Sequence, residues 1–300
     1  MSMPASRSIT DLLDADFLAS MDSLEVISRK ILQGKVQGER RSRRRGQSVE
    51  FAGHRPYVAG DDLRHMDWNI LGRLDQLFLK LFLQEQDLSL RIVTDFSASM
   101  EGGDPPKFQF ARKLSAALAY LGLVNNDRVT VDIFGDGIRC ELSALRGRPC
   151  LAPLAQMLLS APTGGPTDFD KTCRQVAQGT VAPGILIVVS DFLFKDDYRT
   201  SLLRLIARRY DLYVIQVLSP QDLEPDFRGN LKLLDVEDGD QADVAVTDEL
   251  VNAYKRSLDT HCGELREFCA QRGANYLLAN TAQPAESLVL DHLRRRGLLA

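Results

Sequence analysis

The stretch GILIVVS, residues 184–190, determines the fold that we predict for this chain. Every residue between Gly184 and Ser190 is Ile, Leu or Val, and the run is bounded by Pro183 and Asp191. A continuous apolar run of this length is typical of a parallel strand covered on both faces, whereas a strand with one solvated face alternates apolar and polar residues. We therefore predict that residues 184–190 form the central strand of a parallel sheet.

Segments with strand and helix periodicity alternate on both sides of this strand. The predicted strands are 88–94, 128–134, 212–218 and 275–279, and the predicted helices are 107–124, 150–159, 169–178, 198–209 and 247–271. Regular alternation of this kind predicts an α/β fold with a doubly wound, mainly parallel sheet and right-handed crossovers. Residues 77–84 alternate with a period of two, and the short break at 85–87 predicts an antiparallel hairpin with the strand that ends at Asp95.

We divide the chain after residue 87. Residues 1–87 hold an amphipathic helical segment between residues 8 and 33, then an Arg-rich loop and a segment that leads into the sheet, whereas residues 88–300 hold the α/β domain. The 300 residues, 44% of them hydrophobic, suffice for a packed core. No run of about 18 apolar residues is present, and acidic residues interrupt the N-terminus where a signal peptide is apolar. We expect a cytoplasmic protein without a membrane span.

Side chains with oxygen donors follow two of the predicted strands and precede one predicted helix. They are Asp95, Ser97 and Ser99 after the strand 88–94, Thr167 in the loop PTGGPTDFD of residues 162–170, and Asp191 after the central strand. Because the carboxyl ends of parallel strands meet at one edge of a sheet, we expect these residues to converge. Such ligands suit Mg²⁺ or Mn²⁺, and neutral hydroxyls leave the ion with charge that attracts an acidic partner. Taken alone, D-x-S-x-S is also typical of a helix N-cap.

These residues resemble the metal-ion-dependent adhesion site of von Willebrand factor A domains, over roughly residues 88–300. The resemblance implies that Ser97, Ser99 and Thr167 bind the ion directly and that Asp95 and Asp191 bind it mainly through water. It also implies that a Glu or Asp of a protein partner completes the coordination. The loop departs from the usual Gly-Gly-Thr-Asp pattern, because Pro166 precedes Thr167.

The segment of residues 55–86 shows a narrower resemblance, to the signature that precedes this domain in the domain of unknown function 58 family. The matching residues are Tyr57, Gly60, Asp61, Asp62, Arg64, Asp67 and Trp68, followed by a strand that ends near Glu85. Proteins of that family typically accompany MoxR-type AAA+ ATPases, which implies a co-chaperone or assembly role. From the residues alone we favour a structural role, with salt bridges that fix the segment to the sheet and with Trp68 in the core.

A basic run interrupts a chain whose formal net charge is −4. In GERRSRRRG, residues 38–46, the arginines are Arg40, Arg41, Arg43, Arg44 and Arg45. Such a run binds nucleic acid, acidic lipid or acidic protein in some proteins and is a solvated loop in others. No aromatic residue among the arginines can stack on bases, so nucleic acid is not the favoured partner. A nucleic-acid or membrane-surface adaptor stays as an alternative.

The motifs of common enzymes are missing from the sequence. It contains no G-x-S-x-G elbow, no G-x-x-x-x-G-K-[ST] phosphate loop and no H-E-x-x-H. A Mg²⁺-dependent phosphoesterase with Asp95 as nucleophile is a second alternative, but position 97, where the proton donor commonly stands, is Ser. We therefore predict a non-enzymatic, divalent-metal-dependent protein-interaction module. The family resemblance implies that it is a co-chaperone or assembly adaptor working with a MoxR-type AAA+ ATPase.

Overall fold

The computed structural model describes residues 9–22, 24, 50–58, 62–83, 88–179, 184–208, 210–225, 229–234 and 241–289. The chain forms two compact units. The larger unit comprises Met1–Gln37 and Leu88–Ala300, and the smaller unit comprises Gly38–Asp87. No helix within the described ranges is both long enough and apolar enough to cross a membrane.

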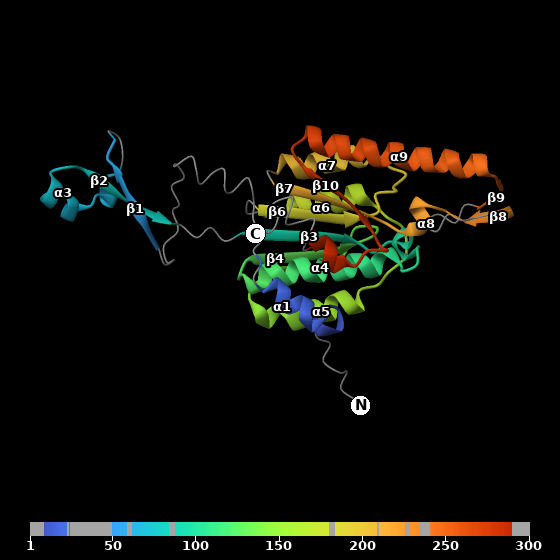
Figure 1. Ribbon diagram of the computed structural model, residues 1–300, viewed down its shortest axis with the longest axis horizontal. Coiled ribbons are helices and arrows are strands. Elements are labelled where there is room, and N and C mark those ends of the chain that lie inside the picture. The colour runs from blue at the N-terminus through green and yellow to red at the C-terminus, as the bar shows by residue number, and fades with distance from the viewer. Residues whose placement is uncertain are drawn as a thin grey trace, which may run out of the picture. The chain divides into compact units, whose positions relative to one another are not determined.

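The larger unit is built on a six-stranded sheet with the order β10-β7-β6-β3-β4-β5 (Figure 1). The strands are β3 (Ser89–Asp95), β4 (Arg128–Phe134), β5 (Ile138–Leu145), β6 (Gly184–Ser190), β7 (Asp211–Leu218) and β10 (Asn275–Asn280). Neighbours pair in parallel, except that β5 runs antiparallel to β4. The predicted doubly wound, mainly parallel α/β fold is confirmed, and every residue of β6 is buried between β3 and β7.

Helices cover both faces of this sheet (Figure 1). One core lies under α4 (Lys107–Val124) and α5 (Leu151–Ser160), and the other under α6 (Phe169–Gln178), α7 (Tyr198–Ala207) and α9 (Asp248–Gln271). Along β6, Ile185, Ile187 and Val189 enter the first core, whereas Leu186 and Val188 enter the second. Burial on both faces is the physical reason for the unbroken apolar run of this strand.

Shorter elements complete the larger unit. They are the helical turns η1 (Ile9–Asp11), η3 (Ala98–Glu101) and η4 (Arg148–Cys150), the helices α1 (Ala15–Met21), α8 (Pro220–Leu223) and α10 (Ala285–Ser287), and an antiparallel pair of strands, β8 (Gly229–Leu234) and β9 (Gln241–Val246). The predictions for residues 107–124 and 128–134 match α4 and β4. The edge strand β5 was not predicted, although Ile138, Cys140 and Leu142 alternate with polar residues in it; all its residues are half-buried or exposed.

The N-terminal helical segment belongs to the larger unit. Leu13, Phe17 and Met21 lie in the core shared with α4 and α5. The Tyr120 hydroxyl donates to Asp22 Oδ1 at 2.6 Å, which ties the end of α1 to α4. This arrangement differs from our grouping of residues 1–87 as one segment, because the apolar face of these helices is buried against α4 and α5.

The smaller unit is a two-stranded sheet with two short helical elements. Strand β1 (Glu50–Pro56) pairs antiparallel with β2 (Phe78–Leu83), and η2 (Leu63–His65) and α3 (Trp68–Leu74) lie between them in sequence. The predicted hairpin between β2 and β3 is wrong. Both edges of β3 are occupied by parallel neighbours, β4 and β6, so β2 finds its partner upstream instead.

Two acidic residues of the signature segment cap these helices. Asp62 accepts from the Arg64 amide at 3.0 Å. Asp67, which is buried, accepts from the Asn69 amide at 2.9 Å and lies 2.8 Å from His54 Nε2. Capping residues of this type stabilise a helix by satisfying its free amides. Tyr57 is half-buried, whereas Gly60 and Asp61 lie outside the described residues.

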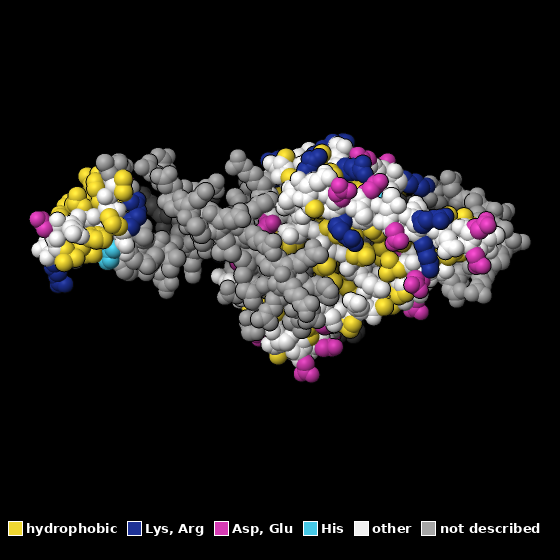
Figure 2. All heavy atoms as spheres, turned by 45° about the horizontal axis from the view of Figure 1, so that its top comes forward, with side chains coloured by type: hydrophobic (Ala, Val, Ile, Leu, Met, Phe, Trp, Pro, Cys, Tyr) yellow, Lys and Arg dark blue, Asp and Glu magenta, His cyan; other side chains and the backbone are white. Residues whose placement is uncertain are grey.

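The prediction that Trp68 fills the core is wrong, because its exposed fraction is 65%. Helix α3 is seven residues long and buries none of them. Figure 2 shows apolar side chains gathered on the smaller unit, where Val58, Leu63, Leu74 and Leu77 are also exposed. Exposed large apolar groups of this kind are a recurrent feature of interaction surfaces.

The exposure of Trp68 leads to a direct prediction, because it is the single tryptophan of the chain. Its fluorescence in the isolated protein should resemble that of a water-exposed indole and should be readily quenched by acrylamide. Replacement by Phe should change the free energy of unfolding by no more than about 0.5 kcal/mol, as is usual for exposed sites. A blue-shifted, quencher-resistant emission would show that another surface covers Trp68.

Candidate functional site

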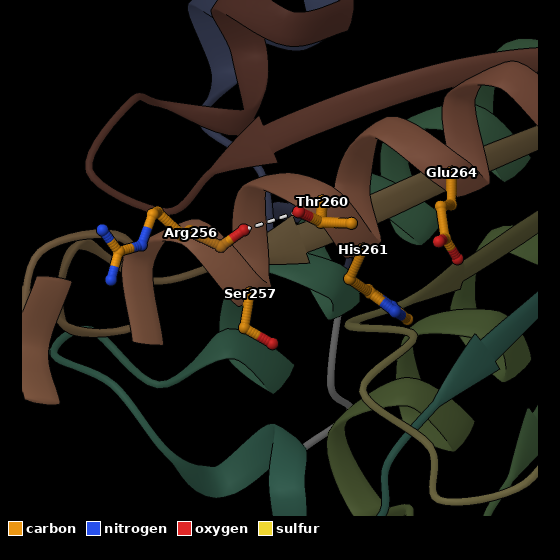
Figure 3. Close-up of a pocket in the computed structure, with 5 residues that line it drawn as sticks. All are labelled: Arg256, Ser257, Thr260, His261 and Glu264. Atoms are coloured by element: carbon orange, nitrogen blue, oxygen red, sulfur yellow. Dashed lines mark hydrogen bonds between the residues drawn. The ribbon is translucent and has the colours of Figure 1, made fainter. Parts of the chain in front are cut away.

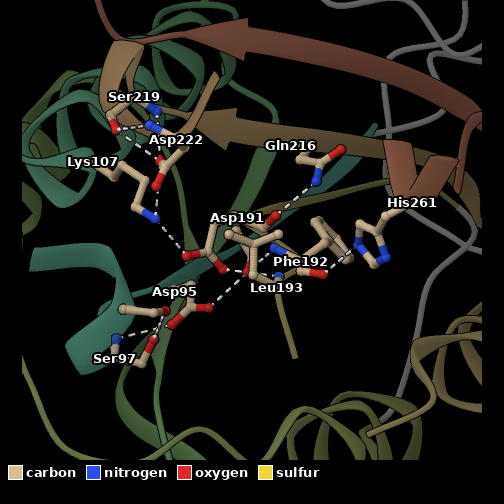
Figure 4. A network of polar contacts seen from close by, with 12 residues as sticks. Asp95, Ser97, Lys107, Asp191, Phe192, Leu193, Gln216, Ser219, Asp222 and His261 are labelled. Atoms are coloured by element: carbon tan, nitrogen blue, oxygen red, sulfur yellow. Dashed lines mark hydrogen bonds and ion pairs between the residues drawn. The ribbon is translucent and has the colours of Figure 1, made fainter. Parts of the chain in front are cut away.

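Two buried carboxylates meet at the carboxyl edge of the central sheet (Figure 4). Asp95 ends β3 and Asp191 directly follows β6, and the two strands are parallel neighbours in register. Neither residue has measurable solvent exposure. The Ser190 hydroxyl donates to Asp95 Oδ2 at 2.7 Å and so joins the two strand ends.

The chain turns sharply after Asp95 and presents two hydroxyls to one another. The Ser97 amide donates to Asp95 Oδ1 at 2.9 Å, and Ser97 Oγ lies 3.2 Å from Ser99 Oγ. Two oxygens that bind one Mg²⁺ at about 2.1 Å and at right angles are themselves about 3 Å apart. The spacing of the two hydroxyls therefore fits a shared octahedral ion.

The Gly-rich loop before α6 lies against this turn. The Gly164 amide donates to the Phe96 carbonyl and the Ala98 amide donates to the Gly165 carbonyl, both at 2.9 Å. Both glycines have positive φ, 87° and 76°, which explains the choice of glycine at these two positions. Thr167, two residues further on, is half-buried. The structure thus brings the loop of Thr167 beside the turn that holds Ser97 and Ser99.

A buried lysine that sequence reasoning missed completes the cluster. Lys107 is the first residue of α4, with an exposed fraction of 3%. Its Nζ lies 2.8 Å from Asp191 Oδ2 and 3.3 Å from Asp222 Oδ2 (Figure 4). One feature of the sequence could have identified it. A lysine at a helix N-terminus is disfavoured by the helix dipole, so its presence there indicates a compensating negative charge nearby.

The Asp191 loop is held from several sides. The Leu193 amide donates to Asp191 Oδ1 at 3.2 Å, and Gln216 Nε2 donates to the Asp191 carbonyl at 2.8 Å. Phe192 has a φ of 55°, a strained conformation for a bulky residue, and its carbonyl lies 2.9 Å from His261 Nε2 on α9. Backbone strain of this kind persists only where the surrounding contacts enforce it. The contacts around Phe192 therefore also hold the neighbouring Asp191 in place.

The positive charge of Lys107 alone does not neutralise the carboxylates of the cluster. Burial, together with the charge of Asp191, raises the pKa of Asp95 to about 7, although hydrogen bonds from Ser97 and Ser190 oppose the shift. Burial disfavours the Lys107 ammonium, but the charges of Asp191 and Asp222 outweigh burial and raise its pKa. A further cation beside Asp95 would relieve the repulsion between the two carboxylates.

The donor set fits a hard divalent cation rather than zinc. Its members are the carboxylates of Asp95 and Asp191 and the hydroxyls of Ser97, Ser99 and Thr167. In the part of the chain that the structure describes, no three His, Cys, Asp or Glu side chains gather as a metal-holding group. An ion bound here would need the serine and threonine hydroxyls as ligands, and such ligands suit Mg²⁺ or Mn²⁺.

Two hollows lie away from the carboxylates. One, of about 390 Å³, runs along α9 and is lined by Arg256, Ser257, Thr260, His261 and Glu264 (Figure 3). The other, of about 250 Å³, lies between the Thr167 loop and the start of α7 and includes Phe169 and Phe194. Asp95 and Asp191 line neither of these two hollows, whereas Thr167 lines the second.

The other predicted residues lie outside the described residues or belong to the smaller unit. Arg40, Arg41, Arg43, Arg44 and Arg45 lie outside the described residues, so their role stays a prediction. The signature residues that are described, from Tyr57 to Trp68, belong to the smaller unit.

Comparison with known proteins gives the family. Residues 53–263 match the family described as "Protein of unknown function DUF58". The chain belongs to this family. The DUF58 chain is 26% identical over 304 residues to the uncharacterized proteins Rv1480 of Mycobacterium tuberculosis and Mb1516 of Mycobacterium bovis. Each match covers 99% of this chain and 96% of the relative.

Two solved structures are similar to the DUF58 chain at lower identity. The conserved hypothetical protein BatB from Bacteroides thetaiotaomicron is 13% identical, with a TM-score of 0.42, and the match covers 69% of this chain and 98% of BatB. The SpRpn10 VWA domain is 11% identical, with a TM-score of 0.40, and the match covers 68% and 94% of the two chains.

The raised pKa of Asp95 predicts how stability depends on pH in the absence of divalent ions. Asp95 binds its proton more tightly in the folded chain, so its contribution is fully present below about pH 4 and is lost as pH rises toward about 7. Through this interval, wild type should lose stability relative to Asp95→Asn as the pH rises. Chemical unfolding in EDTA from pH 4 to 8 measures this difference, and a difference that does not change with pH contradicts the prediction.

Proposed function

We propose that this DUF58 protein is a divalent-cation-dependent protein-interaction module. In this proposal Asp95, Ser97, Ser99, Thr167 and Asp191 hold Mg²⁺ or Mn²⁺ at the edge of the sheet. The observation that carries the proposal is the convergence of two buried carboxylates with a pair of hydroxyls 3.2 Å apart. Bound there, the ion supplies a positive charge to which an oxygen ligand from another molecule can attach.

The charges of the cluster favour an acidic group on the partner. The hydroxyls are neutral, and the Asp191 carboxylate is already paired with Lys107. A divalent ion in this setting therefore keeps part of its charge and attracts a further carboxylate. A Glu or Asp side chain of a protein partner supplies this ligand in our proposal.

We assign the partner to the MoxR-type AAA+ ATPases, with a co-chaperone or assembly role in the cytoplasm. Support for this assignment comes from the resemblance of the Tyr57–Trp68 segment to the signature of the family. The exposed apolar residues of the smaller unit, Trp68 among them, are compatible with a protein-interaction role.

The two alternative functions have less support. A phosphoesterase would need the Asp95 carboxylate to reach a substrate, but the residue is fully buried and both its oxygens accept hydrogen bonds, from the Ser97 amide and the Ser190 hydroxyl. An adaptor for nucleic acid or membrane surfaces would act through the arginines of residues 40–45. No described contact of this chain favours either alternative over the cation-dependent module.

Metal binding can be tested by calorimetric titration of Mg²⁺ and Mn²⁺ into the full chain. Ser97→Ala should weaken binding at least about tenfold, since even residues that only orient metal ligands have effects of this size. Ser160→Ala, which removes a hydroxyl from the exposed end of α5, is the matched control and should bind as wild type does. Equal affinities in all three proteins would mean that the proposed ligand set is wrong.

The partner can be tested by affinity capture from an extract of the source cell, once with Mg²⁺ and once with EDTA, with mass spectrometry of the retained proteins. We expect a MoxR-type ATPase to be retained by wild type only with Mg²⁺, and not by Ser97→Ala. Retention that is insensitive to EDTA but falls steeply with salt would instead favour the arginine run, because such contacts are screened.

A further inference from the structure

We infer that Lys107 is a built-in counter-ion of the Asp95–Asp191 cluster, which holds the cation affinity of the site below that of its ligands alone and lets the chain fold without a bound ion. This inference rests on the proposed function, because it takes the cluster to be a cation site. It goes beyond that proposal because Lys107 is not one of the proposed metal ligands.

The ammonium of Lys107 is fixed at the meeting point of three strand ends. Helix α4, which it begins, follows β3 in the chain, and its two carboxylate partners, Asp191 and Asp222, follow β6 and β7. The Lys107 side chain has an exposed fraction of 3% and contacts both carboxylates. It is therefore part of the buried cluster and not a surface lysine.

The loop before Lys107 is locked onto the segment that holds Asp222. The Asp104 amide donates to Gln221 Oε1 at 3.2 Å, and a Cβ on Gly103 would come within 2.5 Å of Ser219 Cβ. Asp222 in turn accepts from the Ser219 amide and the Ser219 hydroxyl, both at 2.8 Å. These contacts hold the segments on the two sides of the ion pair close together, which favours the position of the ammonium beside Asp191 and Asp222.

A divalent ion beside Asp95 and Asp191 would lie next to this ammonium in a buried setting. Like charges repel strongly there because no water screens them. The ammonium also occupies Asp191 Oδ2, an oxygen that would otherwise be free for the ion or its water. Both effects weaken cation binding, and both should disappear when the charge is removed.

The same ammonium explains how the chain can bury Asp191 without a metal. A buried carboxylate without a partner is strongly destabilising, and many metal sites of this kind make the fold depend on the ion. Here Lys107 compensates the charge internally. An ion can then bind and dissociate without unfolding the chain, as a reversible contact with a partner requires.

Lys107→Met tests the inference, because Met keeps much of the length and apolar volume of the lysine stem without its charge. In calorimetric titration of the full chain with MgCl₂, its affinity should be at least about tenfold higher than that of wild type. Its thermal midpoint should fall in EDTA and recover with Mg²⁺, whereas wild type should change little. Lys107→Arg, which keeps the charge, should follow wild type in both measurements.

Asp222→Asn gives an independent test should Lys107→Met not fold. Removing one of the two carboxylates leaves the ammonium less compensated, so Mg²⁺ affinity should fall several-fold, the opposite direction to Lys107→Met. Asp197→Asn removes an equal charge at the exposed start of α7 and is the matched control, with affinity unchanged.

The outcomes separate the inference from the proposed function. If wild type binds Mg²⁺ and neither Lys107→Met nor Asp222→Asn shifts the affinity, the inference is overturned and the proposed function stands. If Lys107→Met binds Mg²⁺ and wild type does not, the inference stands and the metal-dependent function fails. Absence of Mg²⁺ binding in every variant overturns both.

Discussion

The parallel register of β3 and β6 is the constraint on which the site depends. It brings Asp95 and Asp191 to the same edge of the sheet, where both are fully buried. Two buried carboxylates repel one another and lose their hydration, so the surrounding chain has to compensate them. Much of the local structure is accounted for by this requirement.

Compensation comes from groups on every neighbouring element. The Ser190 hydroxyl and the Ser97 amide serve Asp95, whereas the Leu193 amide and the Lys107 ammonium serve Asp191. The protection is uneven, since Asp191 has an ammonium and Asp95 has only neutral donors. A further positive charge would therefore be most stabilising beside Asp95, on the side of the cluster where Ser97 and Ser99 also lie.

The smaller unit presents a different physical situation. Its helix α3 begins at a well-satisfied cap, with Asp67 bonded to backbone amides and to His54, yet it buries none of its own residues. Met66 and Leu79 are buried in this unit, and helix caps and the β1–β2 pairing add to its order. Other apolar side chains, Trp68 among them, are exposed.

The mainly parallel α/β fold could be predicted from the sequence, whereas the ion-binding residues stay a prediction. Residues 185–189 are all apolar because the strand is covered on both faces, and a local pattern of this kind is visible in the sequence. Asp95, Ser97 and Ser99 also form a local pattern, because they lie two residues apart within one turn of the chain. Pairing across long separations could not be predicted from local patterns: β2 pairs with β1 rather than β3, the N-terminal helices pack on α4 and α5, and Lys107 contacts Asp191 and Asp222. A lysine at the start of a helix looks solvated in sequence, and Trp68 looks buried, because burial depends on which surfaces meet in three dimensions and not on the residue alone.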